Sequence, residues 1–97
     1  MLTHIVCWKY KPGTTQEMRV EHRARLMALT KIIDNITSFN VGEDILHIER
    51  AFDKGLVALF PDREALDFYL DHAEHQKVAA FGRELSDKIV SVDFLNE

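Results

Sequence analysis

Hydrophobic and polar residues alternate in four short stretches of the chain and return every three or four positions in the regions between them. Alternation is typical of β-strands, and the longer period is typical of amphipathic helices. In residues 2–10, His4, Val6 and Trp8 share one face of the expected strand. In chain order, the pattern predicts a strand over 2–10, a helix from 14 to about 33, strands over 39–46 and 54–60, helical segments over 63–70 and 73–88, and a strand over 89–95.

Short local motifs set the ends of these elements. Thr14 and Glu17 have the spacing of a capping box, so Thr14 is the expected N-cap of the first helix. Gly42 interrupts the second strand and is a candidate β-bulge. Asp62 is the expected cap of the next helix, and Asp71-His72 is the expected kink, where Asp71 can cap the last helical segment.

The order of the elements predicts an α+β fold, a ferredoxin-like β-α-β-β-α-β domain over residues 1–97. Its antiparallel four-stranded sheet would carry the helices on one face. Strands one, three and four have apolar residues on both sides, so the open face is expected to be apolar as well. Such a face usually packs on a partner, and we expect a homodimer joined through it, sheet against sheet.

Composition strengthens this expectation. A chain of 97 residues is one domain with a thin core, yet 46% of its residues are hydrophobic. The apolar residues therefore exceed what one small interior needs. A second copy that covers the surplus is the simplest explanation.

Charge and cysteine usage exclude several classes of protein. The net charge is −4, the excess of acidic residues lies in the second half, and no basic patch stands out, so we expect no nucleic-acid partner. No apolar run is long enough to span a membrane, and the N-terminus does not resemble a signal peptide. A single cysteine, Cys7, allows no intramolecular disulfide and suits a cytoplasmic location.

The candidate chemistry lies among five histidines. His75 leads the apolar face of the last helical segment, and the kink could bring Tyr69 into the same space. A neutral imidazole beside a phenol can carry out general acid–base chemistry. His4 and His22 also lie on apolar faces. For all four residues the alternative is a satisfied polar group of the core.

Metal and nucleophilic sites have less support. His72 and His75 have i, i+3 spacing, but the spacing supplies no third ligand, so we expect no metal. Cys7 lies in mid-strand as an inert thiol, and no phosphate-binding or nucleophile motif is present. We therefore expect no cofactor.

Five blocks of sequence resemble the stress-responsive A/B barrel (Dabb) domains. They lie in the order of that family and cover nearly the whole chain: THIVCWKY at 3–10, VG at 41–42, FDKGLVALF at 52–60, LDFYLDHAEH at 66–75 and VSVDF at 90–94. The resemblance implies a ferredoxin-like subunit that forms a homodimeric α/β barrel. Many members of the family have no assigned activity, and some plant members are stress proteins that build larger assemblies.

One branch of the family resembles the polyketide cyclases typified by olivetolic acid cyclase, which need no cofactor. In that branch the Tyr and the second His of the fourth block are the catalytic pair, which here implies Tyr69 and His75. The histidine of the first strand, His4, lies close to that site. The first helix offers His22 and Leu26 here instead of the branch's aromatic pocket residues.

Three functions stay open at this point. The first is a Dabb homodimer that binds a small apolar or carbonyl-containing ligand between sheet and helices, with His72 as a further lining candidate and with cofactor-free chemistry by His75 and Tyr69. The second is a non-enzymatic, stress-related assembly protein. The third, suggested by the shared architecture and Trp8, is a cofactor-free monooxygenase of the dimeric α/β barrel group.

Overall fold

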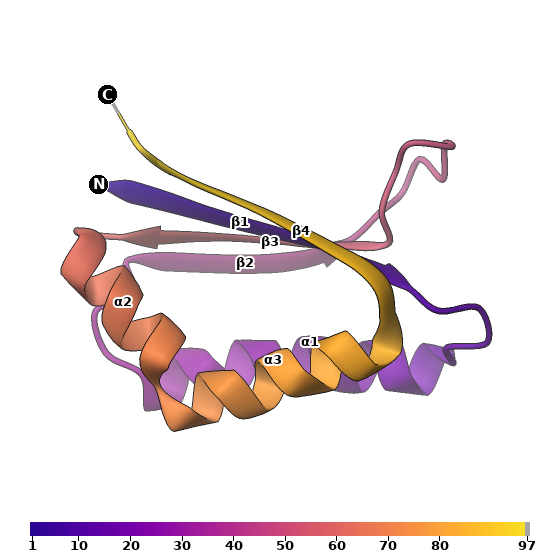
Figure 1. Ribbon diagram of the computed structural model, residues 1–97, viewed down its shortest axis with the longest axis horizontal. Coiled ribbons are helices and arrows are strands. Elements are labelled where there is room, and N and C mark those ends of the chain that lie inside the picture. The colour runs from indigo at the N-terminus through magenta and orange to yellow at the C-terminus, as the bar shows by residue number, and fades with distance from the viewer. Residues whose placement is uncertain (97) are drawn as a thin grey trace.

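The computed structural model describes residues 1–96 as one antiparallel sheet covered on one face by helices (Figure 1). In chain order the elements are β1 (Leu2–Tyr10), α1 (Gln16–Ile32), β2 (Ser38–Glu43), β3 (Lys54–Phe60), α2 (Arg63–Asp71), α3 (Ala73–Leu85) and β4 (Ser86–Leu95). The strands lie in the order β2-β3-β1-β4. The predicted ferredoxin-like α+β subunit is confirmed, and β3 is a central strand as its continuous apolar run indicates.

The core lies between the sheet and the helices. Strands β1 and β3 send alternate side chains toward α1, α2 and α3, because successive residues of a strand point to opposite faces. Helices α1 and α2 pack against these side chains with buried residues at helical spacing. The largest side chains that are almost fully buried are Tyr69, Lys54, Phe60, Leu29, Leu56 and His22. Three of these six carry polar groups, so this core holds unusual chemistry for its size.

The first helix begins one residue later than the capping box predicts. Thr15, not Thr14, is the N-cap, and its hydroxyl accepts a hydrogen bond from the Met18 N–H at 3.2 Å. The Thr14 hydroxyl donates instead to the Lys11 carbonyl at 2.7 Å, which holds the preceding turn. Met18 is exposed rather than part of the buried stripe.

The second strand is shorter than its pattern predicts, and the bulge expected at Gly42 is wrong. β2 ends at Glu43, and Gly42 faces Gly55 in an unbroken register. The shift of register lies instead between Lys9 and Tyr10, where β1 pairs with β4. The apolar residues after Glu43 belong to the exposed connection between β2 and β3, which projects from one end of the molecule (Figure 1).

The last helix is three residues shorter than expected. α3 ends at Leu85, and Ser86 already pairs with Tyr10 as the first residue of β4. The Leu85 carbonyl accepts a hydrogen bond from the Lys11 N–H at 2.8 Å, so a contact with distant backbone ends this helix. The kink at Asp71-His72 is present, but His72, not Asp71, caps α3.

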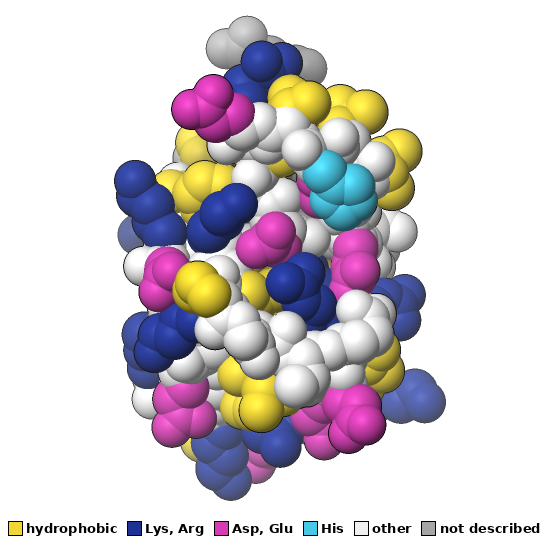
Figure 2. Space-filling view, turned by 90° about the vertical axis from the view of Figure 1, so that its right-hand side faces the viewer, with side chains coloured by type: hydrophobic (Ala, Val, Ile, Leu, Met, Phe, Trp, Pro, Cys, Tyr) yellow, Lys and Arg dark blue, Asp and Glu magenta, His cyan; other side chains and the backbone are white. Residues whose placement is uncertain are grey.

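The face of the sheet away from the helices is apolar across three strands. The pairing places Ile5 of β1 between Val57 of β3 and Val92 of β4. Val90 and Phe94 extend this row along β4, and the four residues other than Ile5 are 42% to 52% exposed. The surface at the end that carries the β2–β3 connection differs, since acidic, basic and apolar side chains are interspersed there (Figure 2).

Candidate functional site

Tyr69 and His75 meet at the break between two helices. Tyr69 lies in the last turn of α2, and His75 lies in the first turn of α3. His72 forms the break, because its N–H donates to the Tyr69 carbonyl while its imidazole accepts from the Glu74 N–H at 3.1 Å. The ring centroids of Tyr69 and His75 are 4.4 Å apart as a result. The break thus joins two residues that one straight helix would point in different directions.

A backbone hydrogen bond fixes the protonation pattern of His75. Its Nδ1 lies 3.2 Å from the Leu70 carbonyl oxygen, which can only accept, so Nδ1 carries the hydrogen and Nε2 keeps its lone pair. Burial lowers the pKa of His75 by more than the hydrogen bond to Leu70 raises it, and the nearby His4, Arg83 and His72 lower it further. The imidazole is therefore neutral near pH 7 and can accept a proton at Nε2.

Tyr69 is buried in an aromatic setting. Its ring is 5.2 Å from the Phe60 ring and 6.2 Å from the Phe39 ring, measured between centroids. Burial raises its pKa, so the phenol keeps its proton and acts as a hydrogen-bond donor. Its hydroxyl has no hydrogen-bond partner within residues 1–96. A carbonyl oxygen of a ligand could occupy that position.

His4 lies next to Tyr69 and is paired with Asp93, a partner that the sequence did not reveal. Its centroid lies 6.0 Å from that of Tyr69. Its Nδ1–H donates to the Asp93 carboxylate, which lies directly opposite on β4. A carboxylate on Nδ1 orients an imidazole and leaves Nε2 free on the other side. Asp93 could have been found only from the register that pairs the first strand with the last.

These side chains line a cavity of about 300 Å³ between the sheet and the helices. Ligand sites usually start at about this size. Its apolar walls are Val6, Trp8, Leu26, Leu56, Leu70, Val78, Ala79 and Ile89, and its polar groups are His4, Tyr69, His75, Arg83 and Ser91. Ile89 and Ser91 are exposed although they share the helix-facing side of the sheet, so the mouth lies between β4 and α3.

The structure brings together four of the six site residues predicted from the sequence. His4, Leu26, Tyr69 and His75 line the cavity, whereas His22 and His72 do not. His22 is sealed between Trp8 and Phe81, and its Nδ1 is 2.7 Å from the Tyr10 hydroxyl. His72 serves as the helix cap described above.

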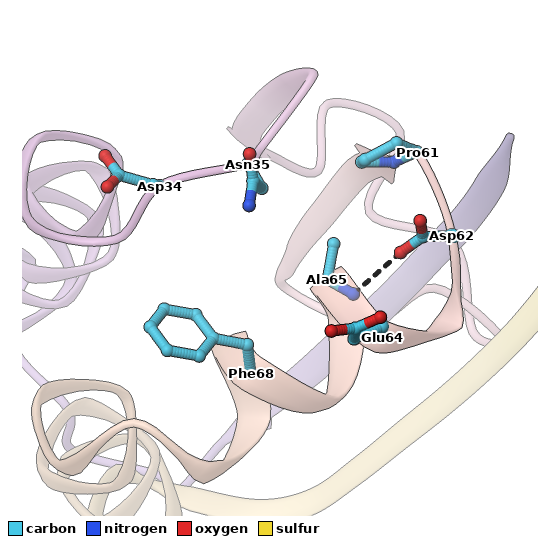
Figure 3. A pocket seen from close by; sticks show the side chains of 7 residues that line it. All are labelled: Asp34, Asn35, Pro61, Asp62, Glu64, Ala65 and Phe68. Carbon is cyan, nitrogen blue, oxygen red and sulfur yellow. Dashed lines mark hydrogen bonds between the residues drawn. The ribbon is translucent and has the colours of Figure 1, made fainter.

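A larger hollow of about 420 Å³ lies at the other end of α2, next to the turn after α1 (Figure 3). Asp34, Asp62 and Glu64 make its lining acidic, and Phe68 is its one aromatic side chain. The Asp62 carboxylate accepts from the Ala65 N–H at 2.9 Å, so it caps α2. Among residues 1–96, no histidine or tyrosine lines this hollow, whereas His4, Tyr69 and His75 line the smaller cavity, which is therefore the candidate site for acid–base chemistry.

Two further features are absent from residues 1–96. No three His, Cys, Asp or Glu side chains come together there in a group that could hold a metal ion. No helix in this part of the chain is long and apolar enough to cross a membrane.

Known proteins resemble this chain in family and fold. The model of the Dabb family, the stress responsive A/B barrel domain, matches residues 2–96. No curated protein matches the sequence. A dimeric ferredoxin-like protein of unknown function from Thermobifida fusca is 20% identical with a TM-score of 0.89, and the match covers 98% of this chain and 90% of that one.

Two other solved structures have the same fold. A dimeric ferredoxin-like protein of unknown function from Jannaschia sp. CCS1 is 24% identical with a TM-score of 0.84, and the match covers 98% of each chain. The hydroxynitrile lyase from Passiflora edulis is 19% identical with a TM-score of 0.88, and the match covers 99% of this chain and 94% of that one. At these identities the likeness concerns the fold.

Proposed function

The chain belongs to the family of stress-responsive A/B barrel domains, and we propose that it binds a small apolar or carbonyl-containing ligand in the cavity and performs cofactor-free acid–base chemistry on it. The observation that carries this proposal is the pairing of Tyr69 with His75, 4.4 Å apart in the wall of the cavity. The hydroxynitrile lyase from Passiflora edulis supports an enzymatic role, because it is an enzyme with the same fold.

The proposed step is proton abstraction next to a carbonyl. His75 Nε2 removes a proton from the α-carbon, and the electron pair of the broken C–H bond moves into an enolate whose negative charge rests on the carbonyl oxygen. Tyr69 donates a hydrogen bond to that oxygen, where charge develops in the transition state. His4, oriented by Asp93, presents a second polar group on the β1 side. The apolar walls exclude water and strengthen these interactions.

The test is exchange of an acidic C–H with solvent. Wild-type protein and the His75→Asn variant are incubated with phenylacetone, a small apolar ketone, in D₂O, and deuterium at its α-carbon is followed by NMR. We expect wild type to accelerate exchange above buffer and His75→Asn to lower that rate about a hundredfold, because a positioned base contributes about that much.

The matched control is His47→Asn, which makes the same change at an exposed position of the β2–β3 connection. His47 has a positive φ of 54°, a conformation that Asn tolerates well, so this variant should fold and exchange as wild type does. Equal rates in the two variants would contradict the acid–base proposal and favour a role in binding or assembly alone.

We also propose that the active unit is a homodimer joined through the open sheet face. The row formed by Val57, Val90, Val92 and Phe94 supports this, since removing half-exposed apolar side chains from water is favourable. The proteins from Thermobifida fusca and Jannaschia sp. CCS1 are both described as dimeric. A covered face would also account for the apolar surplus of so short a chain.

Val92→Lys tests the dimer. Because a lysine there would be buried without a partner in the interface, it should weaken association at least about a hundredfold. Sedimentation velocity over a range of concentrations measures the mass of wild type and variant. Ile45→Lys is the control, because Ile45 is 85% exposed and lies in the β2–β3 connection, off this face. A wild type that stays monomeric at every concentration would overturn the proposal.

A further inference from the structure

The cavity contains one full positive charge, Arg83, in the last turn of α3. His75 lies eight residues earlier on the same helix and also lines the cavity. Eight residues span about 12 Å along a helix axis, so the arginine and the catalytic candidate stand at two ends of one wall. Arg83 is exposed, which places it at the mouth.

No acidic side chain in the lining of the cavity compensates the charge of Arg83. The lining of the cavity contains no Asp or Glu, although the chain as a whole has 16 acidic residues and a net charge of −4. The Asp93 carboxylate on β4 is not part of the lining and accepts a hydrogen bond from His4.

Within the described part of the chain, the guanidinium of Arg83 has no charged partner. Within residues 1–96, Arg83 makes no ion pair and no side-chain hydrogen bond, whereas Arg25 pairs with Glu21 and Arg63 pairs with Asp67. A free guanidinium beside an apolar wall is a ready site for a carboxylate, which it can bind with two parallel hydrogen bonds.

We infer that the ligand of this cavity carries a carboxylate, which Arg83 binds at the mouth while the apolar body of the ligand lies along Trp8, Leu26 and Val78 toward His75. This inference rests on the proposed function, because it assigns a ligand class to the same cavity. It explains why the one cation of the lining stands where a ligand would enter. It also makes the ligand amphipathic: charged at the end near β4 and apolar or carbonyl-bearing at the end near Tyr69.

The geometry adds a link between binding and chemistry. The charge of Arg83 is one of the causes that lower the pKa of His75. A carboxylate bound to Arg83 would offset that charge, and His75 would become a stronger base when the ligand is in place. Arg83 would then position the ligand and prepare the base without touching the reacting atoms.

Binding of two matched probes tests the inference. Octanoate and octanamide have nearly the same shape and differ in charge, and Trp8, the one tryptophan of the chain, lines the cavity and reports binding by its fluorescence. We expect wild type to bind octanoate about tenfold more tightly than octanamide, because a charge-assisted pair at a partly exposed site is worth about that factor. Arg83→Gln should bring octanoate down to the level of octanamide and leave octanamide unchanged.

Arg50→Gln is the control, because it removes an exposed arginine from the β2–β3 connection, away from the cavity. It should retain the preference for octanoate. Equal affinity of wild type for the two probes, or the same loss in both variants, would overturn the role of Arg83 and leave cavity binding intact. Failure of wild type to bind either probe would overturn both the cavity ligand and the inference built on it.

Discussion

The molecule contains two pairs of a buried tyrosine and a histidine, and they stand in opposite relations to solvent and ligand. Tyr69 and His75 lie in the wall of a cavity, with the tyrosine hydroxyl and the histidine Nε2 left for another molecule. Tyr10 and His22 lie between β1 and α1, and they bind each other through a hydrogen bond of 2.7 Å. The residue types are the same, so the surroundings alone separate a pair that lines a cavity from a pair that is sealed in the core.

The Tyr10–His22 pair is closed on every side. His22 is 0% exposed, and the rings of Trp8 and Phe81 stand edge-on to it at centroid distances of 4.9 and 6.0 Å. Gly82 of α3 seals the remaining side, because a Cβ there would lie 3.0 Å from both the His22 Nε2 and the Trp8 Nε1. Glycine lets α3 approach this closely. No ligand can reach the imidazole.

Burial lowers the pKa of the histidine in both pairs. Burial and the neighbouring Lys54 lower the pKa of His22 to about 4, and burial also lowers the pKa of His75. Both imidazoles are neutral near pH 7. Under the proposed function this neutrality lets His75 act as a base on a ligand, whereas the buried His22 has no route to a ligand.

Replacing each tyrosine by phenylalanine should give the largest contrast between the pairs. Tyr69→Phe removes the proposed oxyanion donor, so exchange of phenylacetone should fall about a hundredfold or more while the free energy of unfolding changes little. Tyr10→Phe leaves a buried acceptor, the His22 Nδ1, without a partner. This should lower the free energy of unfolding by about 1–3 kcal/mol and keep the exchange rate. NMR exchange and urea denaturation measure the two effects.

The two variants control each other, because each removes one hydroxyl from a buried ring. Tyr10 is 4% exposed and Tyr69 is 1% exposed, so packing is matched closely. A large loss of stability in Tyr69→Phe with an unchanged exchange rate would contradict the proposed role of the Tyr69 hydroxyl as oxyanion donor. Loss of exchange in both variants would remove the distinction altogether.

The sequence predicted the strands best where a breaker follows a buried run. β1 and β3 have the expected bounds because Pro12-Gly13 and Pro61 follow directly after these apolar stretches. The pattern predicts a β2 that is too long, because Ile45 and Leu46 continue its apolar run. Those two residues lie in the exposed connection, and β2 has no strand residue of β3 left to pair with beyond Glu43. Propensity marks apolar segments, and only pairing decides which of them are strands.

The candidate site could be predicted in part for the same reason. The break at His72 and the helical spacing indicated that Tyr69 and His75 point inward, and the structure places both in the cavity wall. His22 shows the same spacing on α1 but lies under Trp8 and Gly82, a depth that no local pattern encodes. Asp93 was missed because its role depends on register across 89 residues of chain.

Acid sensitivity gives the smaller contrast between the pairs. An unfolded chain binds a proton at His22 near pH 6.5, whereas the folded protein does so only near pH 4. Between these values the unfolded state holds more protons, so the free energy of unfolding falls as the pH falls. The full stability is present above pH 6.5, and about 3 kcal/mol of it should be lost by pH 4 through His22 alone.

His22→Gln isolates this contribution, since glutamine stays neutral and can still accept a hydrogen bond from the Tyr10 hydroxyl. The free energy of unfolding of wild type and variant is measured by urea denaturation from pH 7.5 to 4.5 at one protein concentration. The carboxylates titrate alike in both proteins, so the variant should have the flatter profile below pH 6.5. His47→Gln, at an exposed position, should follow wild type. If the variant loses stability in acid as steeply as wild type, His22 accepts its proton without unfolding. The Tyr10–His22 pair would then be no better sealed from solvent than the Tyr69–His75 pair.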